Sequence, residues 1–278
     1  MEMNKNFYHG AIPSVMTIAG SDSGGGAGIQ ADLKTFSALR VFGTTAITSI
    51  TSQNTVGVND VYNIPIKHIE SQITAVLDDI NVLAVKTGML ATSDIISVVC
   101  SSLKKYNVSK LVVDPVMVAK DGSRLLQKEA ISSLITELIP ISYVITPNVP
   151  EAEDLVSMKI NSIKDMYNAA DKIYKLGAKN VVIKGGHLSG KKSIDVLYNG
   201  TEYSEFSTTR VNTSNTHGSG CTFAAAITAF LSYKIPLLDA VKKAKIYVSE
   251  SLSTDFKVGH GHGPLNHFWG LQFPDLVD

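Results

Sequence analysis

Short apolar runs alternate along the chain with longer segments in which apolar residues recur every three or four positions. The runs Leu111–Val113 and Val181–Ile183 are apolar without alternation, which is typical of strands buried on both faces. Asn199-Gly200 between two such runs is a strong hairpin signal. We predict strands over residues 15–19, 44–50, 81–85, 111–114, 143–146 and 180–184, and a hairpin of 194–198 with 201–206.

The longer segments show helix periodicity, and several carry end signals. Thr92 and Ser162 are suited to cap helix N-termini, and Gly177 is suited to end a helix in the left-handed conformation. Alternating strands and helices predict an α/β fold with a mostly parallel central sheet and helices on both faces. The predicted helices cover residues 27–40, 66–80, 92–106, 127–138, 162–176, 221–232 and 236–254.

Polar and glycine residues follow the predicted strands. In open α/β sheets, ligands bind outside the carboxyl ends of the strands, so we expect the site at this edge. No composition break or linker interrupts the 278 residues, and we expect one domain over 1–278.

Charge and cysteine content narrow the possible functions. Lys plus Arg and Asp plus Glu both number 25, and this balance argues against broad binding to nucleic acid or to an anionic membrane. Cys100 and Cys221 are the two cysteines, too few for a disulfide framework. The N-terminus has no apolar signal region and no run is long enough to span a membrane, so we expect a cytoplasmic protein.

The segment from Asn215 to Thr222 carries the strongest chemical signal. Gly218, Ser219 and Gly220 form a tight turn directly before an Ala-rich helix, whose first N–H groups are unpaired and attract anions. This turn predicts an anion hole for a phosphoryl group. Cys221 lies at the same helix start, where a thiol pKa falls from about 8.5 toward about 7. We therefore expect Cys221 to be able to deprotonate an alcohol, although a helix start with a packed cysteine is the simpler alternative.

Two acids lie beyond strand ends. Asp114 and Glu151 can orient magnesium against phosphate oxygens. Glu151 lies three residues after Asn148, so this pair can equally cap the following helix. The residues leave both interpretations open.

Three other patterns resemble known motifs, but each lacks a feature that its motif requires. Residues 185–192 nearly match a phosphate-binding loop, but Lys192 replaces the final Ser or Thr and a strand follows. Residues 24–28 fail the dinucleotide spacing at Ile29. The three C-terminal histidines lack a carboxylate or thiolate partner at ligand spacing; they are His260, His262 and His267.

Taken together, these motifs resemble the hydroxymethylpyrimidine/phosphomethylpyrimidine kinases, a ribokinase-like family of thiamine synthesis. The resemblance covers roughly residues 14–268 and keeps the order of the motifs. The matching stretches are residues 19–36, 86–90, 114–120, 146–153, 184–187 and 215–222.

The resemblance implies a ribokinase-like fold and a role for each matching residue. Cys221 would stand where related sugar kinases carry an aspartate base, with Gly218, Ser219 and Gly220 as the anion hole. Lys184 and Asn148 would contact ATP, and Glu151 and Asp114 would serve Mg²⁺. The pyrimidine would be held by Gly20, Asp32, Gln53 and Met89, although Asp32 can instead stabilise its helix.

The implied reaction is phosphorylation of 4-amino-5-hydroxymethyl-2-methylpyrimidine by ATP, followed by phosphorylation of the monophosphate. Gln53 supports this, because its amide offers the donor and the acceptor that an aminopyrimidine edge requires. The alternatives are a pyridoxal kinase of the same subfamily and, from another class, a catalytically silent pyrimidine-binding protein. We also expect a homodimer, with residues 47–49 or the hairpin that follows them as the pairing segment, and a lid at 119–126.

Overall fold

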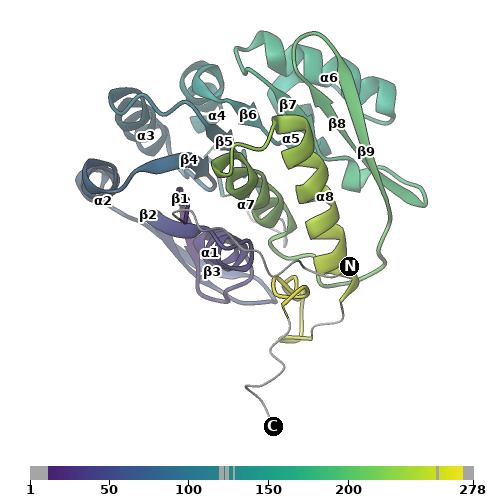
Figure 1. The fold of residues 1–278 in the computed structure, drawn as a ribbon, viewed down its shortest axis with the longest axis horizontal. Coiled ribbons are helices and arrows are strands. Elements are labelled where there is room, and N and C mark those ends of the chain that lie inside the picture. The colour runs from purple at the N-terminus through teal and green to yellow at the C-terminus, as the bar shows by residue number, and fades with distance from the viewer. Residues whose placement is uncertain (1–11, 119–121, 123–124, 128, 255–256, 272–278) are drawn as a thin grey trace.

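The computed structural model describes residues 12–118, 122, 125–127, 129–254 and 257–271. These residues build a nine-stranded sheet in the order β3-β2-β1-β4-β5-β6-β7-β8-β9 (Figure 1). The strands are β1 (Ser14–Asp22), β2 (Phe42–Gln53), β3 (Val58–Asn63), β4 (Val82–Thr87), β5 (Leu111–Val113), β6 (Val144–Ile145), β7 (Val181–Ile183), β8 (Lys192–Tyr198) and β9 (Tyr203–Thr209).

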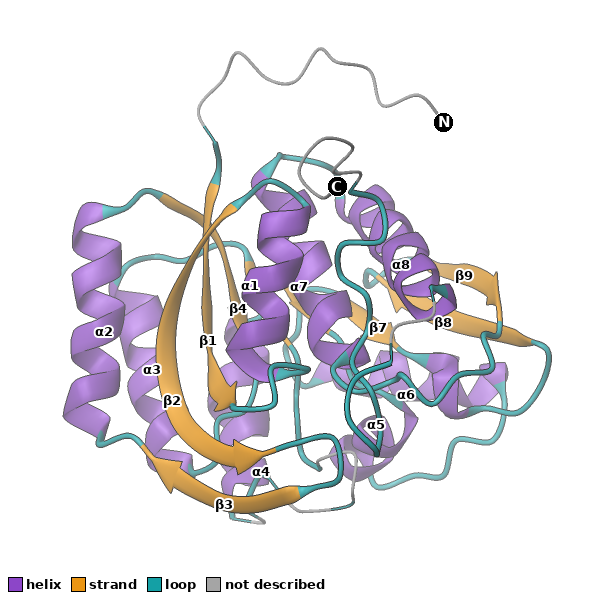
Figure 2. Ribbon diagram, turned by 90° about the horizontal axis from the view of Figure 1, so that it is seen from below, coloured by secondary structure: helices purple, strands orange, loops and turns teal. Residues whose placement is uncertain are grey.

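The middle of the sheet is parallel and its edges are antiparallel. β1 pairs in parallel with β2 and β4, and the parallel pairing continues through β5, β6 and β7. β3 runs antiparallel at one edge, and the β8–β9 hairpin forms the other. Figure 2 shows that β2 curves along its length and that β3 pairs with its far end. The predicted mostly parallel α/β sheet is confirmed.

Helices cover both faces because successive strand residues point to opposite sides. Val15 packs in a core with α1, α7 and α8, whereas Met16 packs in a second core with α2 to α6. The unbroken apolar runs therefore belong to strands buried on both faces. The helices are α1 (Gly28–Ala38), α2 (Ile66–Asp79), α3 (Ser93–Lys105), α4 (Ala130–Ser133), α5 (Val149–Val156), α6 (Ile163–Lys175), α7 (Ser219–Ser232) and α8 (Leu237–Ser253).

The capping and turn residues in the sequence correctly predicted where several of these elements begin or end. The Thr92 and Ser162 side chains accept hydrogen bonds from Ile95 N and Asp165 N at the starts of α3 and α6. Gly177 follows α6 with a φ of 111°. The predicted strands and the β8–β9 hairpin are confirmed.

Two elements were missed and one helix is shorter than expected. The sequence did not predict β3, because its residues are mostly polar and exposed and show no buried pattern. α5 was considered only as the helix that Asn148 and Glu151 would cap, because Pro150 reads as a turn residue. The helix predicted over 127–138 instead begins with α4 at Ala130 and continues as a π-helical turn over Leu134–Leu138.

Of the predicted lid, residues 119–121 and 123–124 lie outside the described residues. Leu125 N and Leu126 N both donate to Met117 O, so the last lid residues are tied to the end of β5. Within the described ranges, no helix is long and apolar enough to cross a membrane.

Candidate active site

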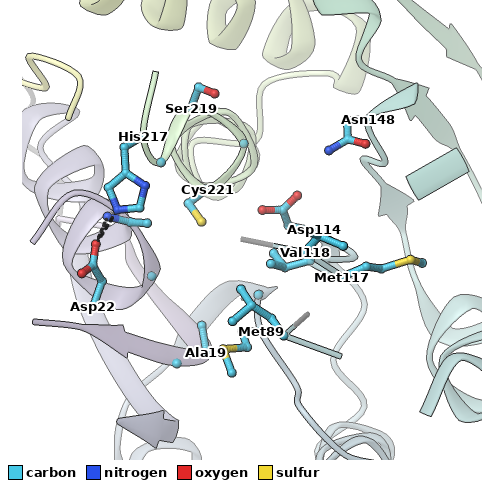
Figure 3. A pocket seen from close by; sticks show the side chains of 18 of the residues that line it. Ala19, Asp22, Met89, Asp114, Met117, Val118, Asn148, His217, Ser219 and Cys221 are labelled. Carbon is cyan, nitrogen blue, oxygen red and sulfur yellow. Dashed lines mark hydrogen bonds and ion pairs between the residues drawn. The ribbon is translucent and has the colours of Figure 1, made fainter. Parts of the chain in front are cut away.

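A pocket of about 400 Å³ opens at the carboxyl ends of the central strands. Its wall combines the ends of β1, β2 and β4 with the residues after β5 and β7 and with the start of α7. This is the sheet edge at which the sequence predicted the site. Figure 3 shows Cys221 between the Asp22–His217 pair on one side and Asp114 on the other.

The first turn of α7 carries the residues of the predicted anion hole. Gly218 is the N-cap with a φ of 80°, and a Cβ there would overlap the Gly26 carbonyl oxygen. Only glycine accommodates both the backbone angle and the close approach. Gly218, Ser219, Gly220 and Cys221 all line the pocket, so the helix N-terminus faces it. The predicted start of this helix at Cys221 is corrected to Ser219, two residues earlier.

The expectation for the Cys221 thiol is wrong for the free protein. Loss of hydration in the pocket wall raises the pKa of Cys221 to about 12, with Asp114 and Asp32 acting in the same direction. The Lys86 ammonium and the Gly28 N–H favour the thiolate but do not outweigh these effects. Cys221 is therefore a thiol at neutral pH.

Lys184 and Asp114 form an ion pair beside the anion hole. Their Nζ and Oδ1 atoms lie 2.9 Å apart. A Cβ at Gly220 would lie 3.1 Å from Lys184 Nζ, so the ammonium group lies against the first turn of α7. Burial would lower the pKa of Lys184, but the nearby Asp114 and Glu151 carboxylates hold this pKa above its usual range. The Lys184 ammonium and the N-terminus of α7 thus lie together in the pocket wall.

Asn148 and Glu151 lie on the adjacent side of the pocket and form the capping box of α5. The Asn148 side chain accepts from Glu151 N at 2.9 Å, and the Glu151 carboxylate accepts from Asn148 N at 2.8 Å. Burial raises the pKa of Glu151 to about 7, opposed by Lys184 and reinforced by Asp114. The capping interpretation is correct, and it leaves Glu151 in the pocket wall.

The carboxylates present suit a magnesium ion. Asp114 and Glu151 repel one another electrostatically while sharing the single ammonium of Lys184. Mg²⁺ is commonly held by one or two carboxylates, with substrate phosphates and water completing its shell. The described residues contain no group of three or more His, Cys, Asp or Glu side chains that would form a cage by themselves. The donor set therefore fits a cation that arrives with phosphate.

Three of the four predicted pyrimidine residues line the same pocket: Gly20, Gln53 and Met89. Gln53 lies beside His217, which is on the other side of Cys221 from Asp114 (Figure 3). A Cβ at Gly20 would lie 3.1 Å from Met89 Sδ, so the glycine leaves room for the methionine at the pocket floor. The side-chain oxygen of Gln53, Oε1, accepts from Thr51 Oγ1 at 3.1 Å.

Asp32 is the exception, and its predicted contact with substrate is corrected. It is fully buried and is absent from the pocket lining. Its Oδ2 atom accepts from Thr17 Oγ1 at 2.6 Å and pairs with Lys86 Nζ at 2.8 Å. Burial disfavours the Lys86 ammonium, but the Asp32 carboxylate outweighs it and holds the pKa of Lys86 above its usual range. Asp32 anchors α1 to the sheet.

Asp22 and His217 were not predicted as site residues. His217 Nε2 lies 2.8 Å from Asp22 Oδ2 and 3.4 Å from the Gln53 amide nitrogen. Burial would raise the pKa of Asp22, yet the hydrogen bond from His217 and the N–H groups of Ala27 and Gly24 hold it below its usual range. An acid at the end of a buried strand, one residue before three glycines, is the signal that could have identified Asp22.

The Asp22 carboxylate explains why the first glycine loop is not a phosphate site. It accepts from the backbone N–H groups of Gly24, Gly26 and Ala27 at 2.8, 3.0 and 2.8 Å. An internal carboxylate therefore occupies the N–H groups that would bind an external anion. The other near-match, residues 185–192, leads into β8 as expected.

The C-terminal histidines do not gather. His260 and His262 are exposed, whereas His267 is buried with Nε2 3.0 Å from Thr222 Oγ1. His267 therefore packs against the second residue after the anion-hole turn.

The sheet is mostly parallel and covered on both faces, and its pocket lies at the carboxyl ends of the strands with the start of α7 in its wall. This arrangement is that of the ribokinase-like kinases. Comparison with known proteins then identifies the family. A family model described as phosphomethylpyrimidine kinase matches residues 22–266, and the chain belongs to this family.

Named relatives agree with this assignment. The chain is 47% identical over 259 residues to the hydroxymethylpyrimidine/phosphomethylpyrimidine kinase of Bacillus subtilis, covering 93% of this chain and 96% of that one. It is 45% identical over 259 residues to the thiamine biosynthesis bifunctional protein ThiED of Geobacter sulfurreducens, covering 93% of this chain. The match spans only 53% of that longer protein.

Solved structures share the fold. The phosphomethylpyrimidine kinase of Clostridium difficile superposes with a TM-score of 0.77 at 46% identity, covering 86% of this chain and 99% of that one. The pyridoxal kinase of Staphylococcus aureus, in complex with AMP-PCP and pyridoxal, gives a TM-score of 0.88 at 38% identity. That match covers 95% of this chain and 96% of the other. The protein is thus a phosphotransferase of the ribokinase-like class.

Proposed function

We propose that the enzyme transfers the terminal phosphoryl group of ATP to the hydroxymethyl oxygen of 4-amino-5-hydroxymethyl-2-methylpyrimidine. It then phosphorylates the monophosphate to the diphosphate in the same pocket. One observation carries this proposal: the phosphate-binding groups and Gln53 line one pocket, and Cys221 lines it with them.

The Gln53 end of the pocket suits a neutral heteroaromatic ring. Gln53 offers an amide donor and acceptor to an aminopyrimidine edge, which offers both in return. The Met89 side chain and the bare backbone of Gly20 provide a flat surface for the ring. His217 lies beside the Gln53 amide, and the hydrogen bond from Thr51 Oγ1 to Gln53 Oε1 restrains the orientation of that amide.

The other end receives phosphate. The N–H groups at the start of α7 and the Lys184 ammonium converge where negative charge increases during transfer. Asn148 lines the same side, as expected for a residue near the nucleotide. Phosphoryl-transfer transition states are loose, so positioning and charge stabilisation contribute more than the strength of a base.

In the first reaction the substrate oxygen forms a bond to the terminal phosphorus, the bond from that phosphorus to ADP breaks, and the hydroxyl proton leaves. We assign proton acceptance to Cys221, which requires the pKa of its thiol to fall when substrates bind. Lys86 and the Gly28 N–H already favour the thiolate, while the Asp114 carboxylate opposes it. Neutralising Asp114 in the loaded enzyme therefore shifts Cys221 toward the form that accepts a proton.

Magnesium is the cation we propose to accompany ATP. Asp114 and Glu151 would hold it, and it supplies neutralisation of phosphate charge when bound. Because a carboxylate binds a cation only after losing its proton, Glu151 is ready for this role above pH 7.

The second candidate is phosphorylation of pyridoxal. It is favoured by the structural match to the Staphylococcus aureus pyridoxal kinase at a TM-score of 0.88. A silent binding protein is not favoured, because Lys184, Glu151 and Cys221 are in place and line the same pocket.

Steady-state release of ADP tests the proposal. With ATP and magnesium, we expect turnover of hydroxymethylpyrimidine and of its monophosphate, and at least tenfold lower kcat/KM for pyridoxal and pyridoxine. A higher kcat/KM for pyridoxal would replace the first candidate by the second and overturn Gln53 as the selecting residue. No ADP release with any of the four would favour the silent binder.

We also propose one domain, a reducing cytoplasm and a homodimer as the setting of this activity. Both cysteines are free, which suits a reducing compartment. Residues 47–49 already have partners within the chain, because Ile47 pairs with Ala19 and exchanges hydrogen bonds with the Gln72 side chain, and Ser49 pairs with Asn63. The outer edge of β3 is the remaining pairing segment, and light scattering of the purified protein measures the mass that tests it.

A further inference from the structure

The chain between β7 and β8 brings two pocket residues, Lys184 and His187, to the phosphate end. This loop, residues 185–191, begins with a 3₁₀ turn over Gly185–His187, and Gly186 and Gly190 are exposed. Its glycines give it a large conformational freedom in the absence of outside contacts. Something beyond the loop must therefore hold it in one shape.

Arg210, just after β9, supplies most of these outside contacts. Its Nε donates to Gly190 O at 2.9 Å and its Nη1 to Gly186 O at 2.6 Å. Its Nη2 donates to Leu188 O and, at 3.5 Å, to Lys192 O. A planar guanidinium holds several donors in fixed directions, so one side chain sets the positions of four carbonyls.

The beginning of the loop has a second anchor. Gly185 N donates to Asp195 Oδ1 at 3.0 Å, and Asp195 Oδ2 pairs with Lys245 Nζ at 2.9 Å. Both side chains of this pair are at least nine-tenths buried, and Lys245 comes from α8. Asp195 holds the first residue of the loop, and the Leu188 side chain packs against the core, whereas the Arg210 side chain binds the carbonyls of Gly186, Leu188 and Gly190.

We propose that Arg210 is a positioning residue for the phosphate donor: by holding four carbonyls of residues 186–192, it keeps the loop in the shape that presents His187 to the nucleotide end of the pocket. Arg210 is absent from the pocket lining, so it acts through the loop and not on the reacting atoms. This inference rests on the proposed function, because it takes the Lys184 end of the pocket as the nucleotide end.

The matched variants are Arg210→Ala, Arg210→Lys and Lys191→Ala. Arg210→Lys keeps the charge but replaces the planar fork with a single ammonium. Lys191→Ala removes a charge from the exposed end of the same loop and leaves the Arg210 side chain in place. The measurements are the Kd for ADP by calorimetry, the KM values for ATP and for the pyrimidine, and the melting temperature.

We expect Arg210→Ala to raise the Kd for ADP and the KM for ATP about tenfold, which corresponds to about 1.4 kcal/mol. The KM for the pyrimidine should stay within about twofold, Arg210→Lys should recover only part of the loss, and Lys191→Ala should match the unmodified protein. An unchanged Kd for ADP, or KM values for both substrates that rise together, would overturn the proposal. Should Arg210→Ala not fold, the same criteria apply to Arg210→Lys.

Calorimetry separates this proposal from the proposed function. If the unmodified protein binds ADP but turns over no pyrimidine, the substrate assignment fails while the effect of Arg210 on ADP binding remains measurable. If the unmodified protein binds no ADP, the nucleotide end is wrongly assigned and both proposals fail.

Discussion

At Cys221, a helix N-terminus and a poorly hydrated pocket wall act on the same thiol in opposite directions. The helix start and Lys86 favour the thiolate, whereas desolvation and Asp114 favour the thiol. The thiol form prevails in the free enzyme. The two phosphorylations depend differently on this balance, because an alcohol must lose its proton and a phosphate monoester has largely lost its own near pH 7.

We therefore predict that Cys221→Ala separates the two reactions. The kcat for the alcohol should fall by about 10² or more, the usual contribution of a positioned base, while the kcat for the monophosphate should fall far less. Initial rates with each purified substrate measure the difference. Cys100→Ala, buried in α3, is the control and should leave both rates unchanged. Equal losses in the two reactions would remove Cys221 from the proton-transfer step.

The role of a residue could be predicted from the sequence where a local backbone motif determines it. It could not be predicted where it depends on partners from remote parts of the chain. The turn before α7 was identified because glycines followed by an Ala-rich helix define an anion site locally. Asp22 and Asp32 both lie near the first glycine loop, and the sequence does not say which of them reaches the pocket. That choice depends on His217 and Lys86, which come from remote parts of the chain.

At the scale of elements, the start of α7 depends on a close approach between two loops. Gly218 has a φ of 80° and packs against the Gly26 carbonyl. The glycine loop and the anion-hole loop thus hold each other in place, and Asp22 binds both through Gly26 N and His217.

Gly218→Ala should therefore displace the anion hole as well as strain its backbone. We expect at least a hundredfold loss of kcat and a lower melting temperature, since the strained angle alone costs roughly 1 kcal/mol and the steric overlap adds to it. Gly190→Ala is the matched control for thermal stability, because its φ is 120° but no atom lies within 4 Å of the added Cβ. A Gly218→Ala melting curve like that of Gly190→Ala, with normal turnover, would contradict this account of the loop contact.

Elements with a buried apolar pattern were predicted well, and elements shaped by tertiary contacts were not. The strands β5, β6 and β7 are short but buried on both faces, so their composition alone identifies them. β3 is exposed and pairs with the edge of β2 that faces away from β1, which is a tertiary contact that its own sequence does not signal. α5 begins at Val149 and Pro150, where proline suits a first helical turn although it reads as a break.

At the scale of the whole molecule, the C-terminal segment closes one side of the site. His262 N donates to Thr55 O at 2.8 Å and His217 N donates to Gly263 O at 3.0 Å. His267 lies beneath α7, against Thr222. Residues near the end of the chain thus fix parts of the pocket wall that lie far apart in the sequence.

This arrangement predicts a pH dependence of stability. Burial lowers the pKa of His267 from 6.5 to about 4. Between pH 6.5 and pH 4 the unfolded chain binds a proton that the folded chain does not, so His267 reduces the free energy of unfolding as the pH falls through this window. Its destabilising effect is absent above pH 6.5 and complete below pH 4.

Urea unfolding of the unmodified protein and of His267→Gln at several pH values between 7.5 and 4.5 measures this effect. The difference in unfolding free energy should shift in favour of the variant as the pH falls, because glutamine has no proton to gain. Other acidic groups titrate alike in both proteins and cancel in the difference. A difference that stays constant with pH would show that His267 is not held neutral by burial.

The central claim is that this pocket phosphorylates one pyrimidine twice, and phosphorus NMR of a single reaction tests it most directly. Hydroxymethylpyrimidine, ATP and magnesium are mixed with the enzyme, and the phosphorus signals are followed over time. The account predicts a phosphate-monoester signal that rises first and then gives way to two diphosphate signals, with two ADP formed for each pyrimidine consumed. ADP and inorganic phosphate without a pyrimidine ester, or no consumption of ATP, would contradict it.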